Sequence, residues 1–164
     1  MINVNKEEKN ACFTGHRQIS KNEYDGIQKR LESEIINLIH QGVQNFCAGG
    51  ALGFDTMAAL AVLRLKEKYP YVQLTLILPC KEQTRGWPEA DKKIYGQILR
   101  QADKAVYTSE HYYKSCMFTR NRAMADNSGV CVCYLTSEKG GTAYTVGYAK
   151  QKGLRIINLA SESS

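Results

Sequence analysis

Short apolar runs alternate along the chain with longer segments in which apolar residues recur every three to four positions. The runs that are typical of strands cover residues 11–13, 43–48, 72–78, 105–107, 129–135 and 154–159. The segments between them have helical spacing, the first between Ser20 and Gly42 and the others ending near residues 68, 101, 126 and 152. This alternation predicts an α/β protein: a Rossmann-like three-layer sandwich with a mostly parallel sheet and helices on both faces.

The first predicted helix carries a signal at each end. Ser20 and Glu23 match a capping box, in which each side chain satisfies a free backbone N–H of the first turn. Gly42 stands where a glycine commonly ends a helix. Farther along, the run 72–78 is nearly all apolar, which is typical of a strand buried on both faces of a parallel sheet.

The length of 164 residues predicts a single domain over 1–164, with flexible ends at 1–10 and 160–164. Hydrophobic residues make up 43% of the chain and charged residues 23%, so a full core can be buried. No apolar run reaches the roughly 18 residues of a membrane span, and the polar start is no secretory signal. We therefore expect a cytoplasmic protein that does not engage a membrane.

The six cysteines are interpreted as core residues. They form no Cys-x-x-Cys pair, and no histidine stands at the spacing of a zinc site. Cys12, Cys47, Cys131 and Cys133 fall inside strand-like runs, where free cysteine acts as a small hydrophobic residue. We expect all six to be reduced and structural, and we predict neither a metal nor a cofactor.

The net charge of the chain indicates what kind of molecule it could bind. Lys and Arg number 22 against 16 Asp and Glu, which gives a formal net charge of +6. This favours anionic partners such as nucleotides or nucleic acid. The basic residues are scattered, however, and most are interpreted as solvated surface, so nucleic acid is not the favoured partner.

Glycine-bearing turns follow three of the predicted strands, and two of them lead into helices. They contain Gly15, then Gly49, Gly50 and Gly53, then Gly140 and Gly141. Such turns let the backbone approach a phosphate, and a helix N-terminus offers it free N–H groups. The alternative is that they are merely tight turns. Neither the G-x-G-x-x-G fingerprint nor a P-loop is present, which disfavours an ordinary NAD dehydrogenase or ATPase.

Two charged residues near these turns each have two interpretations. Asp55 either caps the helix that begins there or accepts a hydrogen bond from a ligand hydroxyl. Arg120 lies on a short helix ahead of the strand 129–135. Its guanidinium suits bidentate phosphate binding, although an exposed arginine needs no ligand. The nearby glycine turns favour the phosphate interpretation for Arg120.

These residues carry a family resemblance. Met117-Phe-Thr-Arg120-Asn121-Arg-Ala-Met124, an apolar strand and Gly140-Gly141-Thr142 resemble the signature of LOG-type nucleoside-monophosphate phosphoribohydrolases. The turn from Gly49 to Asp55 is similar to that of the Rossmann domain of the DNA-processing protein DprA. Thr14-Gly15-His16-Arg17 and the Gln83-to-Trp87 loop are most similar to the YpsA-like family. All belong to the SLOG superfamily, and the resemblance covers about 10–160.

The departures from the LOG signature leave enzymatic activity open. Aligned on Gly141 and Thr142, the catalytic LOG glutamate falls at Tyr144, and the lysine after the arginine falls at Asn121. Without that carboxylate, the group expected to stabilise or protonate a glycosidic cleavage is absent. No catalytic residue is assigned.

Carried over position by position, the resemblance implies a ligand cleft with a phosphate cradle. Its residues would be Thr14, Gly15, Arg17, Gly49, Gly50, Gly53, Asp55, Gln83, Trp87, Arg120, Gly140, Gly141 and Thr142. Trp87 would stack on a base with Gln83 hydrogen-bonding nearby, or else plug the sheet edge. His16 is adjacent to the cleft, where it would act as an acid or base or, on the safer assumption, cap a turn or stand in solvent.

Three functions follow, in order of preference. The first is binding or sensing of a nucleotide-derived ligand such as ADP-ribose, NAD or a nucleoside phosphate. The second is hydrolysis of an N-glycosidic bond in such a compound, and the third is DprA-like nucleic-acid binding, which would weaken steeply with salt. The alanine-rich helix 55–65 would either form a homodimer interface or, as we expect, pack on the sheet.

Overall fold

Six parallel strands form one sheet in the computed structural model, which describes residues 6–160. The strands are β1 (Asn10–Gly15), β2 (Asn45–Ala48), β3 (Gln73–Leu78), β4 (Lys104–Tyr107), β5 (Val130–Tyr134) and β6 (Arg155–Asn158). The helices are α1 (Lys21–His40), α2 (Phe54–Leu65), α3 (Glu89–Gln101), α4 (Cys116–Asp126) and α5 (Gly141–Gln151). The predicted Rossmann-like alternation of strands and helices is therefore confirmed, and the sheet is parallel throughout.

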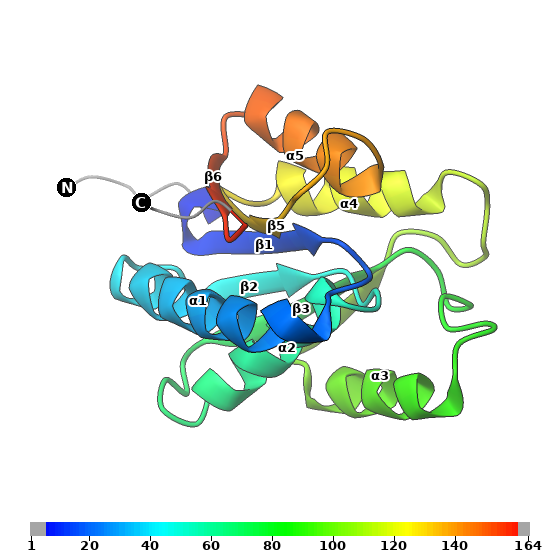
Figure 1. Cartoon of the computed structure of the whole chain (residues 1–164), viewed down its shortest axis with the longest axis horizontal. Coiled ribbons are helices and arrows are strands. Elements are labelled where there is room, and N and C mark those ends of the chain that lie inside the picture. Colours follow the sequence, from blue (N-terminus) through cyan, green and yellow to red (C-terminus); the bar gives the residue numbers. More distant parts are fainter. Residues whose placement is uncertain (1–5, 161–164) are drawn as a thin grey trace.

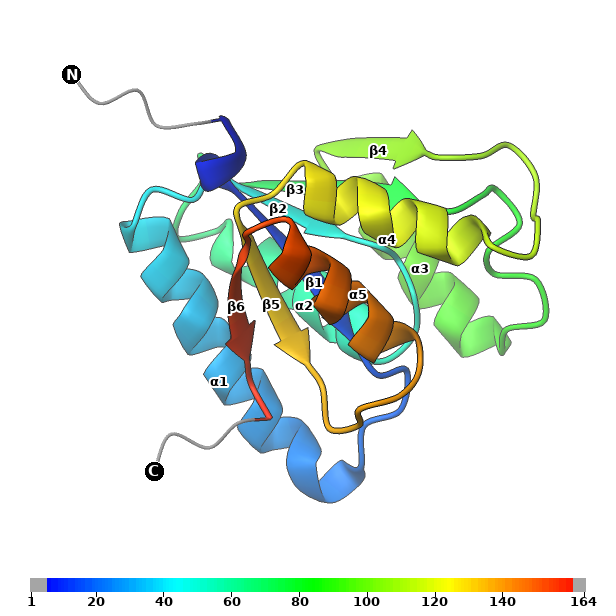
Figure 2. The same cartoon turned by 90° about the horizontal axis from the view of Figure 1, so that it is seen from above.

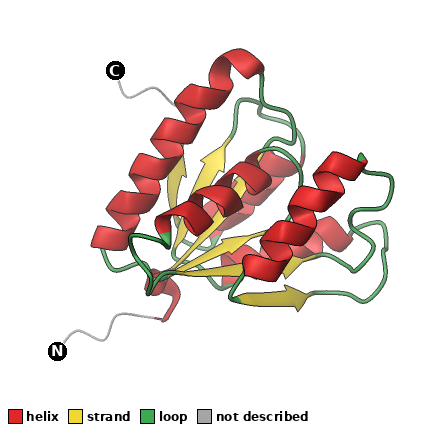
Figure 3. Ribbon diagram, turned by 90° about the horizontal axis from the view of Figure 1, so that it is seen from below, coloured by secondary structure: helices red, strands yellow, loops and turns green. Residues whose placement is uncertain are grey.

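The order of the strands creates a crevice at one place in the sheet. The order is β4-β3-β2-β1-β5-β6, so the chain runs outward from β1 to β4 and then returns to pair β5 with the other side of β1. Helices α1, α2 and α3 cover one face, and α4 and α5 cover the other (Figure 1). Figures 2 and 3 show the same layers from above and below. The chain leaves β1 and β5 toward opposite faces, which opens a crevice at their carboxyl ends.

The side chains of the central strands alternate between two apolar layers. Phe13, Phe46 and Leu74 lie in the larger core with the inward faces of α1 and α2. Cys12, Cys47, Cys131 and Cys133 lie in a smaller core with Met124 of α4. Burial on both faces explains the nearly continuous apolar runs of the sequence. All six cysteines are buried and free of disulfides, as predicted.

Helix α2 uses its apolar surface within the chain. Phe54, Met57, Ala58, Ala61 and Val62 are all buried in the larger core. This is the packing that we expected in preference to a homodimer interface. No helix in the described range 6–160 is long and apolar enough to cross a membrane.

The element boundaries differ from the sequence prediction at a few places. Helix α2 ends at Leu65 rather than near residue 68, because Lys66–Tyr69 continue as tight turns. At the N-terminal end, Lys6–Lys9 form a 3-10 turn and Asn10 already begins β1. The predicted flexibility of residues 1–5 and 161–164 concerns positions outside the described residues.

The predicted capping box of α1 is wrong. Ser20 is the N-cap residue, but its side chain makes no capping hydrogen bond. The carboxylate of Glu23 instead accepts a hydrogen bond from the hydroxyl of Tyr134, at the end of β5. The carboxylate of Glu23 thus makes a tertiary hydrogen bond with Tyr134 instead of the local bond of a capping box. At the other end, Gly42 follows the C-cap residue Gln41, as predicted.

Because Ser20 makes no capping bond and Glu23 makes a tertiary one, we expect Glu23→Ala to destabilise the protein more than Ser20→Ala. Ser20→Ala should change the free energy of unfolding by less than about 0.5 kcal/mol, below the roughly 1 kcal/mol of a working cap. Glu23→Ala should cost more, about 1 kcal/mol, because it removes the acceptor of the Tyr134 hydroxyl. Chemical denaturation of both variants measures the two values. A larger loss of stability for Ser20→Ala than for Glu23→Ala would contradict this prediction and support a capping box.

Candidate functional site

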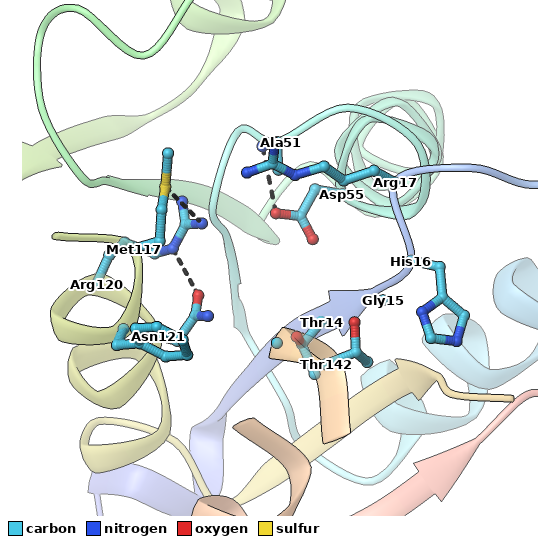
Figure 4. A pocket seen from close by; sticks show the side chains of 12 residues that line it. Thr14, Gly15, His16, Arg17, Ala51, Asp55, Met117, Arg120, Asn121 and Thr142 are labelled. Carbon is cyan, nitrogen blue, oxygen red and sulfur yellow. Dashed lines mark hydrogen bonds between the residues drawn. The ribbon is translucent and has the colours of Figure 1, made fainter. Parts of the chain in front are cut away.

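A cleft of about 300 Å³ lies at the crevice between β1 and β5, at the carboxyl edge of the sheet. It is bounded by the end of β1, the turn before α2, and the first turns of α4 and α5 (Figure 4). The residues that line it are Thr14, Gly15, His16, Arg17, Ala51, Asp55, Met117, Phe118, Arg120, Asn121, Gly141 and Thr142. The volume lies at the lower end of the range for small-molecule pockets.

Seven of the residues predicted from the sequence meet in this cleft. They are Thr14, Gly15, Arg17, Asp55, Arg120, Gly141 and Thr142, which come from four separate parts of the chain. The close packing at the end of β1 explains one of them. A Cβ at Gly15 would come within 2.5 Å of the Phe54 ring, so only glycine lets β1 run directly over the start of α2.

The glycines of the turn between β2 and α2 do not line the cleft. A Cβ at Gly49 would come within 2.5 Å of Nη1 of Arg120 and 2.9 Å of Oδ2 of Asp55. A Cβ at Gly50 would come within 2.6 Å of Leu78, and one at Gly53 would overlap the backbone of Arg17. These glycines therefore permit close packing of the protein on itself. Ala51 of this turn and Asp55 of the first turn of α2 line the cleft instead.

Arg120 is a buried cation, only 3% exposed. Its Nη1 donates to the carbonyl oxygen of Gly49, its Nε donates to Oδ1 of Asn121 at 2.7 Å, and its Nη2 lies 3.8 Å from the sulfur of Met117. Burial lowers the pKa of Arg120, and the carboxylate of Asp55 opposes that effect. Because thioether sulfur is a weak acceptor, Nη2 retains most of its capacity to donate to a ligand.

Asp55 is the buried carboxylate of the cleft, 5% exposed. Its Oδ2 accepts the backbone N–H of Ala51 at 3.3 Å (Figure 4). Burial raises the pKa of Asp55, while the charge of Arg120 and the N–H of Ala51 lower it. The side chain bonds back to the turn before α2. This is a different role from the helix cap considered for it.

A chain of hydrogen bonds joins Arg120 to the start of α5. Asn121 accepts from Arg120 and donates through Nδ2 to Oγ1 of Thr145 at 3.0 Å. The hydroxyl of Thr145 in turn donates to the carbonyl of Gly141 at 2.9 Å. The first bond of α5 runs from the N–H of Tyr144 to the carbonyl of Gly140, so the N–H groups of the three preceding residues are left at the helix N-terminus.

Two further predicted residues lie beside the cleft in other contacts. The amide Nε2 of Gln83 donates to the carbonyl of Gly49 at 3.1 Å, and its Oε1 accepts the hydroxyl of Tyr95. Trp87 packs edge-on against the ring of Tyr95, with the ring centroids 5.7 Å apart. The structure does not bring Trp87 or Gly140 into the cleft.

His16 lines the cleft and also holds a turn. Its Nε2 accepts a hydrogen bond from the backbone N–H of Thr136 at 2.9 Å. This agrees with the safer interpretation of His16 as a residue that caps a turn.

Sequence reasoning did not place Ala51, Met117, Phe118 or Asn121 in the cleft. The signal for two of them was present, because Met117, Arg120 and Asn121 stand at positions i, i+3 and i+4 of one helix and so share a face. Tyr144, at the position of the LOG glutamate, is 45% exposed, and its hydroxyl accepts from Nη1 of Arg122 at 3.1 Å. Among the described residues, no three His, Cys, Asp or Glu side chains are placed to hold a metal ion.

The strand order and the glycine turns at the carboxyl edge define a Rossmann-like α/β protein with its cleft at the topological switch point. A family model named YpsA, described as "YspA SLOG family", matches residues 12–157. The chain therefore belongs to the YpsA family of SLOG proteins.

Curated relatives agree with this assignment. A UPF0398 protein of Halalkalibacterium halodurans is 33% identical over 129 residues, covering 77% of this chain and 68% of the relative. The UPF0398 protein YpsA of Bacillus subtilis is 30% identical over 129 residues, covering 77% of this chain and 72% of the relative.

Solved structures of DprA share the fold. DprA from Streptococcus pneumoniae superposes with a TM-score of 0.67 at 18% identity, over 90% of this chain and 48% of that protein. DprA from Helicobacter pylori, in a structure titled for its single-stranded DNA binding mode, gives a TM-score of 0.64 at 18% identity, over 90% of this chain and 63% of that one. This chain thus spans about half to two thirds of the DprA chains.

Proposed function

We propose that this protein binds a nucleotide-derived ligand whose phosphate occupies the cleft between β1 and β5. The observation that carries the proposal is the convergence of anion-binding groups in that cleft. The guanidinium groups of Arg17 and Arg120 line it together with Gly141 and Thr142, at the N-terminus of α5. Free N–H groups and the positive end of the helix dipole favour a phosphate at such a place.

The charges of the cleft favour an anion that also carries hydroxyl groups. Two guanidinium groups line the cleft against one carboxylate, that of Asp55. Arg120 is already desolvated and held by Asn121 and Gly49, so a phosphate would meet a fixed donor rather than a mobile one. The carboxylate of Asp55 offers an acceptor to a ribose hydroxyl.

Two other functions remain as ordered alternatives. N-glycosidic hydrolysis comes second, because Tyr144 replaces the glutamate of the LOG signature and Asp55 is the carboxylate that lines the cleft. Nucleic-acid binding comes third. It is favoured by the net charge of +6 and by the similarity to a DprA whose structure is titled for single-stranded DNA binding.

A thermal-shift screen tests the proposal, with Arg17→Ala as the informative variant. Arg17 is exposed and lines the cleft, so its removal should spare the fold. AMP, ADP, ATP, NAD, ADP-ribose and cyclic dinucleotides form the panel. A ligand at about 100 times its Kd adds about 2.7 kcal/mol, which raises the Tm of a chain of this size by about 5–10 °C.

We expect Arg17→Ala to weaken the binding of the responding ligand about 10- to 100-fold, through the loss of a charge-assisted hydrogen bond. Arg122→Ala is the matched control, because Arg122 bonds to Tyr144 and does not line the cleft. No shift with any ligand, or equal losses in the two variants, would contradict the proposal. Chromatography of the same mixtures would reveal a product if the protein is a hydrolase.

A further inference from the structure

A second pocket, which we call the Tyr112 pocket, adjoins the cleft. It has a volume of about 320 Å³ and is lined by Glu82, Gln83, Arg85, Tyr112 and Met117. Met117 lines both the cleft and the Tyr112 pocket, so its side chain is the partition between them. Nη2 of Arg120 lies 3.8 Å from the sulfur of Met117, so Arg120 contacts this partition from the cleft side.

The cleft and the Tyr112 pocket also share one backbone hydrogen-bond acceptor. The carbonyl oxygen of Gly49 accepts from Nη1 of Arg120 on the cleft side and from Nε2 of Gln83 on the other, the latter at 3.1 Å. Both side chains are buried, with 3% and 6% exposure. Their positions are therefore fixed relative to each other, and one ligand could extend from the cleft over Met117 into the Tyr112 pocket.

The charges of the two spaces differ in a way that orients such a ligand. The cleft has two guanidinium groups against one carboxylate, whereas the Tyr112 pocket balances Glu82 against Arg85, whose Nη2 lies 3.6 Å from Oε2 of Glu82. A hydrogen bond with His111, at 3.0 Å, lowers the pKa of Glu82 and keeps it ionised. A phosphate is therefore favoured in the cleft, and an uncharged group is favoured in the Tyr112 pocket.

The aromatic and thioether groups of the Tyr112 pocket suit a flat ring. Tyr112 is 61% exposed, so the face of its ring is accessible to a ligand in the pocket. Aromatic side chains stack on nucleobases, and thioether sulfur packs well against ring edges. Tyr112 and Met117 line the same pocket and present both kinds of surface.

We propose that the Tyr112 pocket is the nucleobase subsite of the nucleotide whose phosphate occupies the cleft. This inference rests on the proposed function and adds the part of the ligand that distinguishes a nucleotide from a sugar phosphate. The base stacks on Tyr112 beside Met117, and the ribose crosses the partition.

The test compares ligands with and without a base. AMP and ADP-ribose are titrated against ribose 5-phosphate by calorimetry, using the full chain and the variants Tyr112→Ala and Tyr113→Ala. Tyr113 is the matched control, since it is a neighbouring exposed tyrosine whose hydroxyl bonds to Thr119 and which does not line the pocket. Tyr112→Ala should weaken AMP or ADP-ribose about 5- to 100-fold and leave ribose 5-phosphate unchanged. Tyr113→Ala should change neither.

The outcomes separate this inference from the function on which it rests. Equal affinities of the wild type for AMP, ADP-ribose and ribose 5-phosphate would overturn the base subsite while leaving the phosphate cleft standing. Retained nucleotide affinity in Tyr112→Ala, or an equal loss in Tyr113→Ala, would also overturn the base subsite. Failure of the wild type to bind any of these three ligands would overturn the base subsite, and failure with every ligand of the thermal-shift panel as well would overturn both proposals.

Discussion

Gly53→Ala is expected to lower the free energy of unfolding by about 3–5 kcal/mol, a large share of the 5–15 kcal/mol typical of a domain. Two separate effects add at this position. Gly53 has φ +78° and ψ −120°, a conformation that L side chains rarely adopt. A Cβ there would also overlap the carbonyl group of Arg17, which is backbone and cannot swing away.

Two other glycines separate the two effects. Gly42 has φ +104° with open space where a Cβ would stand, so Gly42→Ala should show the strain alone, about 1–3 kcal/mol. Gly147 lies within α5, also with open space, so Gly147→Ala should stabilise the protein by about 0.5–1 kcal/mol. Chemical denaturation of the three variants gives the ranking. A loss for Gly53→Ala no larger than that for Gly42→Ala would show that the loop carrying Arg17 yields to the added methyl group.

Arg120→Met should cost about 3–5 kcal/mol of unfolding free energy, because it removes the stronger of the two positive charges, Arg120 and Arg17, that favour the buried carboxylate of Asp55. The loss should depend on pH. Burial already raises the pKa of Asp55 in the folded chain, and removal of Arg120 raises this pKa further. The folded variant thus binds the Asp55 proton more tightly than the unfolded chain does.

The sign of the pH dependence follows from that difference. Stability contributed by a raised pKa is present below the unfolded value, near 3.9 for aspartate, and is lost as the pH rises through the folded value. We therefore expect Arg120→Met to be less stable at about pH 8 than at about pH 5, relative to the wild type. The double variant Asp55→Asn with Arg120→Met should remove this slope and recover part of the stability. Denaturation at the two pH values measures it, and a pH-independent loss would mean that Asp55 is not the group left unpaired.

The fold was predictable from the sequence because its signals are local. The apolar run of β3 and the helical spacing of α3 each identify an element without its neighbours, and α3 ends at Gln101 as predicted. The strand order does not have such a signal. Nothing within β1 indicates that it pairs with both β2 and β5, since that choice depends on the packing of helices on both faces.

The candidate site was predictable where residues lie at the end of a strand or the start of a helix, as Thr14 and Gly141 do. The glycines of the turn after β2 show the limit of this reasoning. Their spacing indicates a close backbone approach, and such an approach is observed, but it is to Arg120, Leu78 and the Arg17 backbone rather than into the cleft. Sequence alone does not tell which atom approaches a glycine. The prediction for Glu23 was wrong for a similar reason: its carboxylate bonds to the hydroxyl of Tyr134, which is distant in the sequence, rather than to the backbone at the start of α1.

The pairing of β1 with β5 has a consequence for how the protein emerges from the ribosome. Strands β1 to β4 and helices α1 to α3 all precede residue 108, whereas the residues of β5 that pair with β1, such as Cys131, are translated later. Until then, one face of the nascent sheet lacks α4 and α5. The thiols of Cys12 and Cys47, which end up buried, stand on that bare face. The burial of these two thiols therefore depends on the part of the chain that is translated last.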